Sequence, residues 1–225
     1  MRMKSIFRHE TILFLVVIVA LVILSIQAEQ FATIDNLLNQ GRFLTEVSLV
    51  ALIMTFVIVT GGIDLSVGSI LGLSAIVLGV AWKKLGLPLP LAILVALSVG
   101  TLAGLFNGII ITRFKVPPLI ATLATLALYR GLAEGISQAR SIRGYPEWFF
   151  ILGQGEFFGI PTQLWIVAFF TLLTGFILTY TTWGRATYAI GANETAARFS
   201  GIAVDKTKLF IYAASGFAAS LAAII

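Results

Sequence analysis

The sequence contains no cysteine, a single histidine and few charged residues, and each shortage excludes a class of function. Without cysteine, the 225-residue chain has no disulfide framework, no thiolate metal site and no cysteine nucleophile. No G-x-x-x-x-G-K-S/T phosphate loop occurs, so the chain does not bind ATP by that route. No Ser/His, His/Glu or paired-Asp constellation is visible either. We therefore expect neither an enzyme nor a bound metal or cofactor, and nothing in the sequence points to nucleic acid.

What the sequence does contain is long apolar runs. Hydrophobic residues make up 59% of the chain and charged residues 11%, whereas a soluble domain usually carries about 25% charged residues. A membrane-spanning helix needs about 20 apolar residues. The runs predict an all-α, polytopic transmembrane helix bundle with about six complete spans and a truncated seventh. We expect the spans at 11–28, 43–60, 65–82, 89–112, 117–138 and 163–183, with the seventh beginning near 208.

The C-terminal residues SGFAASLAAII are still apolar at Ile225. A helix that ends inside the bilayer leaves its last carbonyl groups without partners. We therefore expect residues 1–225 to be the N-terminal part of one transmembrane domain in a longer natural protein. The alternative is a genuine short last span.

Basic residues are divided unequally between the two sides of the expected bundle. The first apolar run, 11–28, is longer than the core of a signal peptide, so we interpret it as a retained span. Because Lys and Arg favour the cytoplasmic side, nine against five predict a cytoplasmic N-terminus. The nine are Arg2, Lys4, Arg8, Arg113, Lys115, Arg185, Arg198, Lys206 and Lys208; the five are Arg42, Lys83, Lys84, Arg140 and Arg143.

One carboxylate, Asp64, stands in the apolar stretch VTGGIDLSVGS between two expected spans. Gly61 and Gly62 interrupt the helix before it, and a good helical sequence follows. An Asp at a helix N-cap accepts a hydrogen bond from an N–H two or three residues on, here that of Ser66 or Val67. A charge at membrane depth is costly unless it is buried in protein or faces water. Asp64 is therefore expected to cap a helix, and either does only that or also lines a polar pathway with Gly61, Gly62 and Ser66.

Other polar and small residues within the spans have less specific explanations. Arg130 and Glu134 are one turn apart and are expected to pair, with snorkelling at the outer interface as the favoured interpretation. Asn107 is expected to bond between helices. Small residues at four-residue spacing are expected to let helices pack closely; they are Gly68 and Gly72, Gly100, Gly104 and Gly108, Gly131 and Gly135, and Ala214, Ala218 and Ala222.

The segment IGANETAARFSGI predicts a short helix outside the membrane. Asn193 suits the N-cap, Glu194 the positive helix end and Gly201 the left-handed position after the helix. Glu194 and Arg198 have the favoured spacing for an ion pair. A helix of about two turns is unstable alone in water, so it needs a docking site on its own bundle or on a partner. Ala196, Ala197, Phe199 and Ile202 supply a small apolar surface for that contact.

Three blocks of the sequence resemble one family. VTGGIDLSVGSILGLSA, LFNGIIITRFKVPPLIATLATLALYRGLAEGIS (105–137) and GRATYAIGANETAARFSGI (184–202) are similar to the permease subunits of bacterial ABC importers for monosaccharides, the ribose, xylose, arabinose, rhamnose and autoinducer group. The second block looks closest to the rhamnose and autoinducer branch. Family members are longer than this chain.

The resemblance implies a passive permease in the bacterial inner membrane. It implies a coupling loop at about 184–207 that docks in a groove of a separate ABC ATP-binding subunit. The expected contact residues are Asn193, Glu194, Ala197, Arg198, Phe199 and Gly201. It also implies a periplasmic sugar-binding protein and a second permease copy or a paralogue as partners.

Two alternatives belong to other classes. The first is a secondary transporter that uses Asp64 for proton or cation coupling; such carriers often contain paired broken helices, but GGIDLS has no second copy in these residues. The second is a membrane-embedded enzyme, for which no catalytic set is visible. The loop and the lack of a nucleotide motif favour the importer.

Overall fold

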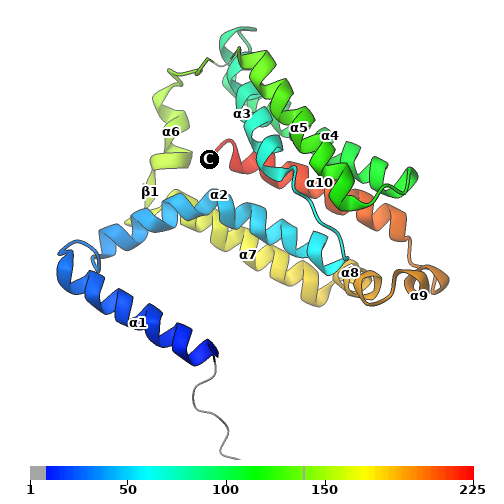
Figure 1. Ribbon diagram of the computed structural model, residues 1–225. Coiled ribbons are helices and arrows are strands. Elements are labelled where there is room, and N and C mark those ends of the chain that lie inside the picture. The colour runs from blue at the N-terminus through cyan, green and yellow to red at the C-terminus, as the bar shows by residue number, and fades with distance from the viewer. Residues whose placement is uncertain (1–8, 139) are drawn as a thin grey trace, which may run out of the picture. The chain divides into compact units, whose positions relative to one another are not determined.

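The computed structural model describes residues 9–138 and 140–225, and this part of the chain is mostly helical (Figure 1). It divides into two compact units, residues 1–43 and 44–225. The helices are α1 (His9–Gln27), α2 (Ile34–Val59), α3 (Val67–Lys83), α4 (Leu89–Arg113), α5 (Pro118–Ser137), α6 (Glu147–Gln154), α7 (Thr162–Tyr180), α8 (Thr182–Ala192), α9 (Glu194–Phe199) and α10 (Val204–Ala222). Helix α2 begins in the first unit and continues into the second.

Several helices are long and apolar enough to cross a membrane. Among the described residues four qualify by length and composition, namely α2, α4, α5 and α7, while α1 and α3 are apolar but shorter. The helices therefore occur close to where the apolar runs predict spans. Most ends differ by a few residues, and α2 differs more: it begins at Ile34 rather than near 43 because the polar stretch before the apolar run also folds as helix. The number of spans stays a prediction.

The second unit is built around close contact between α4 and α10. A Cβ atom on Gly104 would overlap the backbone carbonyl of Tyr212, and one on Gly216 would overlap that of Gly100. Gly100 in turn lies against Ser220. This confirms the expectation of close helix packing for the glycines of α4, because backbones can approach this closely only where side chains are absent.

The other glycine pairs are different. A Cβ atom on Gly68, Gly72, Gly131 or Gly135 would meet nothing within 4 Å. The expectation of close packing is therefore wrong for these two stripes within the described chain. Their helices, α3 and α5, pack together through other side chains, among them Ile70, Leu73 and Tyr129.

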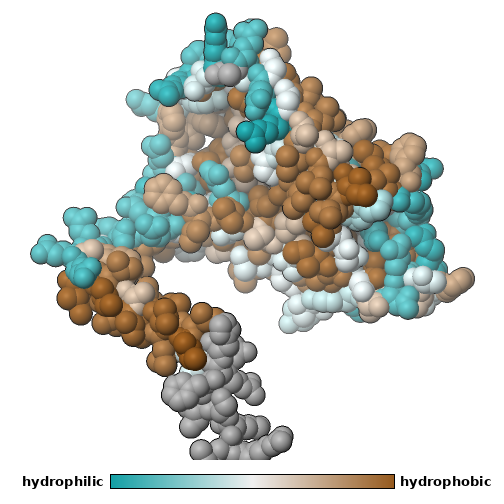
Figure 2. All heavy atoms as spheres, in the orientation of Figure 1, coloured by the Kyte–Doolittle hydropathy of each residue, from teal (hydrophilic) through white to brown (hydrophobic). Residues whose placement is uncertain are grey.

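The surface of the second unit is largely apolar along the helices. Figure 2 shows hydrophobic residues over much of the visible face, with hydrophilic residues gathered toward the ends of the helices. Exposed large side chains such as Leu94, Leu102 and Leu172 belong to this surface. Such a surface suits helices surrounded by lipid.

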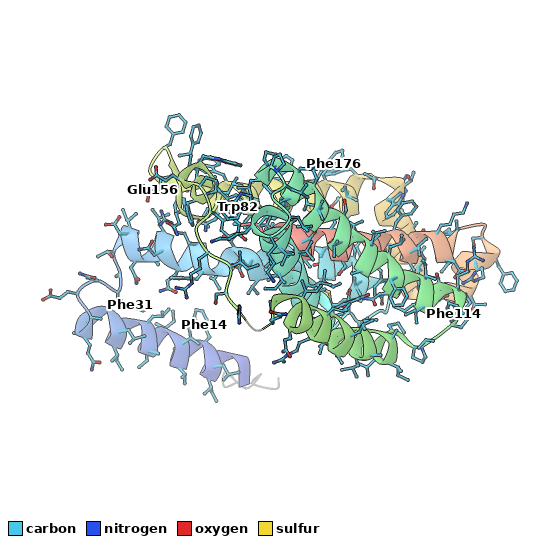
Figure 3. The ribbon with its side chains drawn as sticks, turned by 90° about the horizontal axis from the view of Figure 1, so that it is seen from above. Phe14, Phe31, Trp82, Phe114, Glu156 and Phe176 are labelled. Carbon is cyan, nitrogen blue, oxygen red and sulfur yellow. The ribbon has the colours of Figure 1, made fainter. Side chains whose placement is uncertain are left out.

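The two ends of this unit carry different basic residues. In Figure 3, Trp82 of α3 and Phe114, just after α4, lie at opposite ends. At the first end Lys83 donates to the carbonyl of Arg143. At the second, Lys115 pairs with Asp205 at 3.0 Å. For Lys83, Arg143 and Lys115 this is the grouping that the sequence predicts, and which end faces the cytoplasm stays a prediction.

The connection between α5 and α7 contains structure that the sequence analysis left unassigned. Helix α6 packs Phe149 beside Tyr145, with ring centroids 5.0 Å apart, and Tyr145 stacks on Trp82. A hairpin follows, in which β1 (Glu156–Phe157) pairs antiparallel with β2 (Ile160–Pro161). Phe158 and Gly159 turn the chain with φ of 53° and 71°, as a two-residue hairpin requires.

Candidate functional site

Helix α2 ends in a glycine-terminated turn, and the chain then passes against α10 before α3 begins. Gly61 has φ of 74°, and the N–H groups of Gly61 and Gly62 donate to the carbonyls of Ile58 and Val57. This is the pattern of a glycine-terminated helix, which explains Gly61. Gly62 has another reason: a Cβ there would come within 2.8 Å of the Tyr212 hydroxyl. The two glycines therefore end α2 and let the chain pass against α10.

Asp64 lies just beyond this turn and is buried, with 1% of its surface exposed. Its Oδ1 accepts hydrogen bonds from the backbone N–H of Ser66 at 3.0 Å and from the Ser66 hydroxyl at 2.6 Å. Its Oδ2 accepts one from the hydroxyl of Ser215 on α10 at 2.9 Å. Both oxygens are thus bonded to donors of the protein.

The same network continues into α4 and α5. The Asn107 amide donates to the Ser66 hydroxyl at 2.7 Å. The Tyr129 hydroxyl lies 3.5 Å from Asn107 Oδ1 and donates to the Ala103 carbonyl at 2.8 Å. We call Asp64, Ser66, Asn107, Tyr129 and Ser215 the Asp64 network. It joins α3, α4, α5 and α10, all through buried polar atoms.

This geometry corrects the expected role of Asp64 as N-cap of α3. The helix begins at Val67, its N-cap is Ser66, and the Ser66 side chain makes no capping hydrogen bond to the first turn of the helix. Asp64 does accept the expected bond from the Ser66 N–H, but as part of a turn before the helix. The reason is that residues 62–66 belong to neither helix, and this connection places Asp64 beside α10. Asp64 lines none of the described grooves in this structure, so pathway lining stays a prediction.

The predicted cytoplasmic loop forms two helices. Helix α8 follows α7 after Thr181, whose side chain accepts from the Gly184 N–H. Helix α9 is the short helix that the sequence predicts: the Asn193 side chain accepts from the Ala196 N–H at 2.9 Å, and Gly201 has φ of 85°. The cap and the left-handed glycine are confirmed, and α8 is an addition that the motif did not indicate.

A set of exposed ion pairs fixes α9 to its surroundings. Arg198 pairs with Glu194 at 3.1 Å, as predicted, and also with Asp205 at 2.9 Å. Lys208 pairs with Glu194 at 2.5 Å, and Lys115 with Asp205. We call these five residues the loop ion network. It connects α9 to α10 and to the loop after α4.

These contacts shift pKa values in directions that their charges explain. The hydrogen bond from Arg198, more than that from Lys115, holds the pKa of Asp205 well below its usual range. The hydrogen bond from Lys208 does most to lower the pKa of Glu194, which Arg198 lowers further. Both carboxylates therefore stay charged at neutral pH.

The exposed and buried faces of α9 differ from the expectation. Ala197 is buried against Ile190 and Val204, with Ile202 packed beside them, so it contacts its own bundle and is unavailable to a partner. The sequence predicts Ala197 as a docking residue because the pattern of a six-residue helix does not show which face packs against the rest of the same protein. Phe199, in contrast, is 91% exposed, although it is large and apolar.

Helix α8 also touches the break before Asp64. A Cβ atom on Gly191 would overlap the carbonyl of Val59, the last residue of α2. The loop helices and the turn at Gly61 are therefore in direct contact. No pattern in the sequence indicates this contact or the roles of Tyr212, Ser215 and Asp205. Small residues recurring on α10 were a signal for Ser215, but nothing indicated its partner.

Comparisons with known proteins agree with this architecture. Residues 34–225 match the family described as "Branched-chain amino acid transport system / permease component". The ribose import permease protein of Haemophilus influenzae is 39% identical over 94% of this chain and 67% of its own length. The L-arabinose transport system permease protein of Escherichia coli is 36% identical over 87% of this chain and 59% of its own. The autoinducer 2 import system permease protein of an Enterobacter species is 38% identical over 79% and 51%.

The chain thus spans between about half and two thirds of the length of these relatives. No solved structure matches it. The family match includes both the Asp64 network and the loop ion network, because it runs from the start of α2 to the last residue. On this match, the chain belongs to the family of permease components of branched-chain amino acid transport systems.

Proposed function

We propose that the chain is part of a transmembrane permease subunit of an ATP-driven ABC importer for a monosaccharide or a related small sugar. The observation that carries this proposal is the match to a ribose import permease over 94% of the chain. That match leaves little of the chain for an added domain with another activity. The family description names branched-chain amino acids, whereas the relatives above are named for ribose, L-arabinose and autoinducer 2.

Helix α9 is proposed as the contact with a separate ATP-binding subunit. Phe199 would enter an apolar groove on that subunit, where a large exposed side chain gains most by losing contact with water. Asn193 and Gly201 hold the two ends of α9, and Glu194 and Arg198 brace it. Because Ala197 faces the bundle, a push on α9 would move α10 and α8 with it.

The Asp64 network is proposed as the place where that movement meets the transmembrane helices. Gly191 on α8 lies against Val59, two residues before Gly61, and Gly62 lies against Tyr212. Movement of α8 is therefore passed directly to the turn that positions Asp64. Ser66 and Ser215 then carry it to α3 and α10.

The remaining partners and the orientation belong to the same proposal. A periplasmic sugar-binding protein would deliver the sugar, and a second permease copy or a paralogue would complete the pathway in the bacterial inner membrane. The N-terminus is proposed to be cytoplasmic, as the Lys and Arg distribution favours. Arg2, Lys4 and Arg8, which contribute to that distribution, lie outside the described residues.

Secondary transport through Asp64 receives less support. Carriers of that kind bind their coupling ion at groups that reach water from alternate sides. Asp64 has 1% of its surface exposed and bonds through both oxygens to serine donors. A structural role for the carboxylate suits this arrangement better.

The proposal is tested with the full-length chain co-expressed with candidate ATP-binding and binding-protein subunits. ATP-dependent uptake of labelled D-ribose, L-arabinose and L-leucine into vesicles is measured, together with recovery of the ATPase on the tagged permease. We expect uptake of a sugar and not of leucine. Leucine uptake alone would overturn the sugar assignment, and uptake that persists without ATP and without the ATPase would overturn the importer itself.

Phe199→Asp provides the matched variant for the docking contact. It should abolish ATPase recovery while leaving the membrane level of the permease unchanged, because the side chain is exposed. Phe158→Asp is the control, since Phe158 is 86% exposed but lies before α7, at the other end from α8. Equal recovery with both variants would exclude α9 as the docking helix.

Orientation is tested by single-cysteine labelling, which is clean because the chain has no native cysteine. Lys115→Cys and Lys84→Cys lie at opposite ends of the helices. An impermeant thiol reagent applied outside should label K84C and not K115C. The reverse result would invert the proposed topology.

A further inference from the structure

Between α3 and α5 lies a groove of about 400 Å³, whose lining includes Leu65, Gly68, Ser69 and Gly72 on one side and Arg130, Ala133 and Glu134 on the other. Its volume is within the range of small-molecule sites, about 300–1,000 Å³. The groove is open because Gly68 and Gly72 carry no side chains and no other part of the described chain fills the space beside them.

Two charged side chains face this groove from a helix that qualifies as a membrane span. Arg130 Nε donates to Glu134 Oε1 at 3.1 Å, and the two side chains are 74% and 65% exposed. Arg130 is about 18 Å from the start of α5 and about 10 Å from its end, at the helical rise of about 1.5 Å per residue. The sequence favours snorkelling of this pair at the outer interface, but both side chains line the groove beside Gly68 and Gly72. An exposed ion pair facing lipid there is unfavourable, so we infer that the groove faces water or is covered by protein.

The chemistry of the groove suits a neutral hydroxylated ligand. The ion pair uses only Nε and Oε1 among contacts within the described chain, which leaves Nη donors of Arg130 and an acceptor of Glu134 for a ligand. The Ser69 hydroxyl donates to the Ser66 carbonyl at 2.7 Å, so its oxygen remains able to accept. Paired opposite charges favour neither an anion nor a cation, whereas adjacent hydroxyl groups both donate and accept.

We propose that this groove is a sugar-binding section of the translocation pathway, with Arg130 and Glu134 as the residues that hydrogen-bond the hydroxyl groups. The proposal rests on the proposed function and adds the site within it. The groove adjoins the α2–α3 connection: Leu65, which lines the groove, lies in the chain between Asp64 and Ser66 of the Asp64 network, and the groove residue Ser69 donates to the Ser66 carbonyl. A movement of that connection therefore reshapes the groove.

The first test is water access in the assembled transporter. Ala133→Cys places a thiol in the groove, and Ser98→Cys places one on an exposed, lipid-facing position of α4 where the native hydroxyl bonds its own helix. A hydrophilic methanethiosulfonate reagent should modify A133C and leave S98C unmodified. Labelling of neither would mean that lipid covers the groove, and disulfide formation between two A133C chains without labelling would mean that a second copy covers it. Either result overturns the proposal.

The second test is uptake by Glu134→Gln and Arg130→Gln in the complete transporter. Each should lower ATP-dependent uptake of labelled D-ribose or L-arabinose about tenfold, as expected when one charge-assisted hydrogen bond is lost. Membrane level and ATPase recovery should be unchanged, because an exposed pair adds little to stability. Glu147→Gln on α6 makes the same chemical change outside the groove and should retain full uptake.

These readouts separate failure of the site from failure of the proposed function. If the unsubstituted transporter imports the sugar and both glutamine variants import it equally well, the site is wrong and the function stands. If the unsubstituted transporter imports neither sugar, the proposed function fails, and the sugar site fails with it whatever the labelling shows. Labelling of A133C that is slowed by the imported sugar, together with reduced uptake by both variants, supports the site.

Discussion

The Asp64 network and the loop ion network both organise carboxylates, but they use opposite kinds of partner. Asp64 is buried and, within the described part of the chain, bonds to neutral donors: the N–H and hydroxyl of Ser66 and the hydroxyl of Ser215. Asp205 has a side chain that is 43% exposed and bonds to the cations of Arg198 and Lys115. Direct contacts connect the two regions through α8 and α10.

The two kinds of partner imply that the two networks respond differently to helix movement, water and salt. A buried network of neutral donors around a carboxylate loses its partners only if the helices separate, because no water replaces the broken bonds. Exposed ion pairs exchange easily with water and salt, so they hold a position without locking it. The interior contacts thus hold four helices in register, whereas the ion pairs brace α9 against α10 with weaker contacts.

The largest loss of stability is expected from a substitution that disrupts the close backbone contact between α4 and α10. Gly104→Ala places a Cβ atom on the Tyr212 carbonyl, so α4 and α10 must move apart and the Asp64 network must break. We expect a loss of at least about 3 kcal/mol, the upper end of the range for overpacking, and a sharp fall in folded protein. Thermal unfolding in detergent measures it.

Gly175→Ala on α7 is the matched control for this change. A Cβ atom there meets nothing within 4 Å, so helix propensity alone predicts a small gain in stability, up to about 1 kcal/mol. If both variants unfold at the same temperature, close approach of α4 and α10 does not set the stability of the interior.

A smaller loss of stability is expected from a substitution that removes the carboxylate acceptor of the Asp64 network but leaves the helix packing in place. Asp64→Ala leaves the N–H of Ser66 and the hydroxyls of Ser66 and Ser215 without their partner. The two hydroxyls can rotate toward other acceptors, so the lasting cost is mainly that of one buried donor left unpaired, about 1–3 kcal/mol. Asp64→Asn keeps one carbonyl oxygen for Ser66 and should be milder. The two variants are compared by unfolding temperature and by sugar uptake. Equal damage from both would assign the role to the charge and not to the hydrogen bonds.

The sequence predicts best those features of the fold and the candidate site that arise from residues close together in the chain. The Asn193 cap, the Gly201 turn, the Glu194–Arg198 pair and the bond from Ser66 N–H to Asp64 all arise within a few residues, and all are present. The apolar runs likewise locate the helices, because bilayer thickness sets their length.

Contacts between distant residues were not predictable in the same way. Ser215 reaches Asp64 across 151 positions, and no spacing rule connects them. The same holds for the burial of Ala197 and for the contact of Gly191 with Val59. Glycine spacing alone gave equal expectations for the stripe on α4, which is packed, and the one on α5, which is open. Only the positions of the neighbouring helices distinguish them.

In the loop, a backbone change should have a larger effect than a change of charge. Gly201 has φ of 85° and open space around it, so Gly201→Val is strained through its backbone alone, at about 1–3 kcal/mol. We expect α9 to lose its exit turn and ATPase recovery to fall, with normal membrane level. Gly201→Asn is the control, since Asn tolerates this conformation better. Equal recovery with both would mean that the turn is not needed for docking.

The smallest effect is expected from the ion pairs themselves. Asp205→Asn removes the contacts to Arg198 and Lys115, and exposed pairs contribute about 0–1 kcal/mol. The depressed pKa of Asp205 means that its stabilisation is complete above its unfolded pKa and is lost only as pH falls through the folded one. ATPase recovery should therefore not vary between about pH 5 and 8 on its account. Salt at about 1 M should weaken recovery slightly in the wild type and less in D205N, because the Debye length falls to about 3 Å. A loss as large as that of Asp64→Ala would show that the loop is locked as firmly as the interior, and the contrast between the two networks would be wrong.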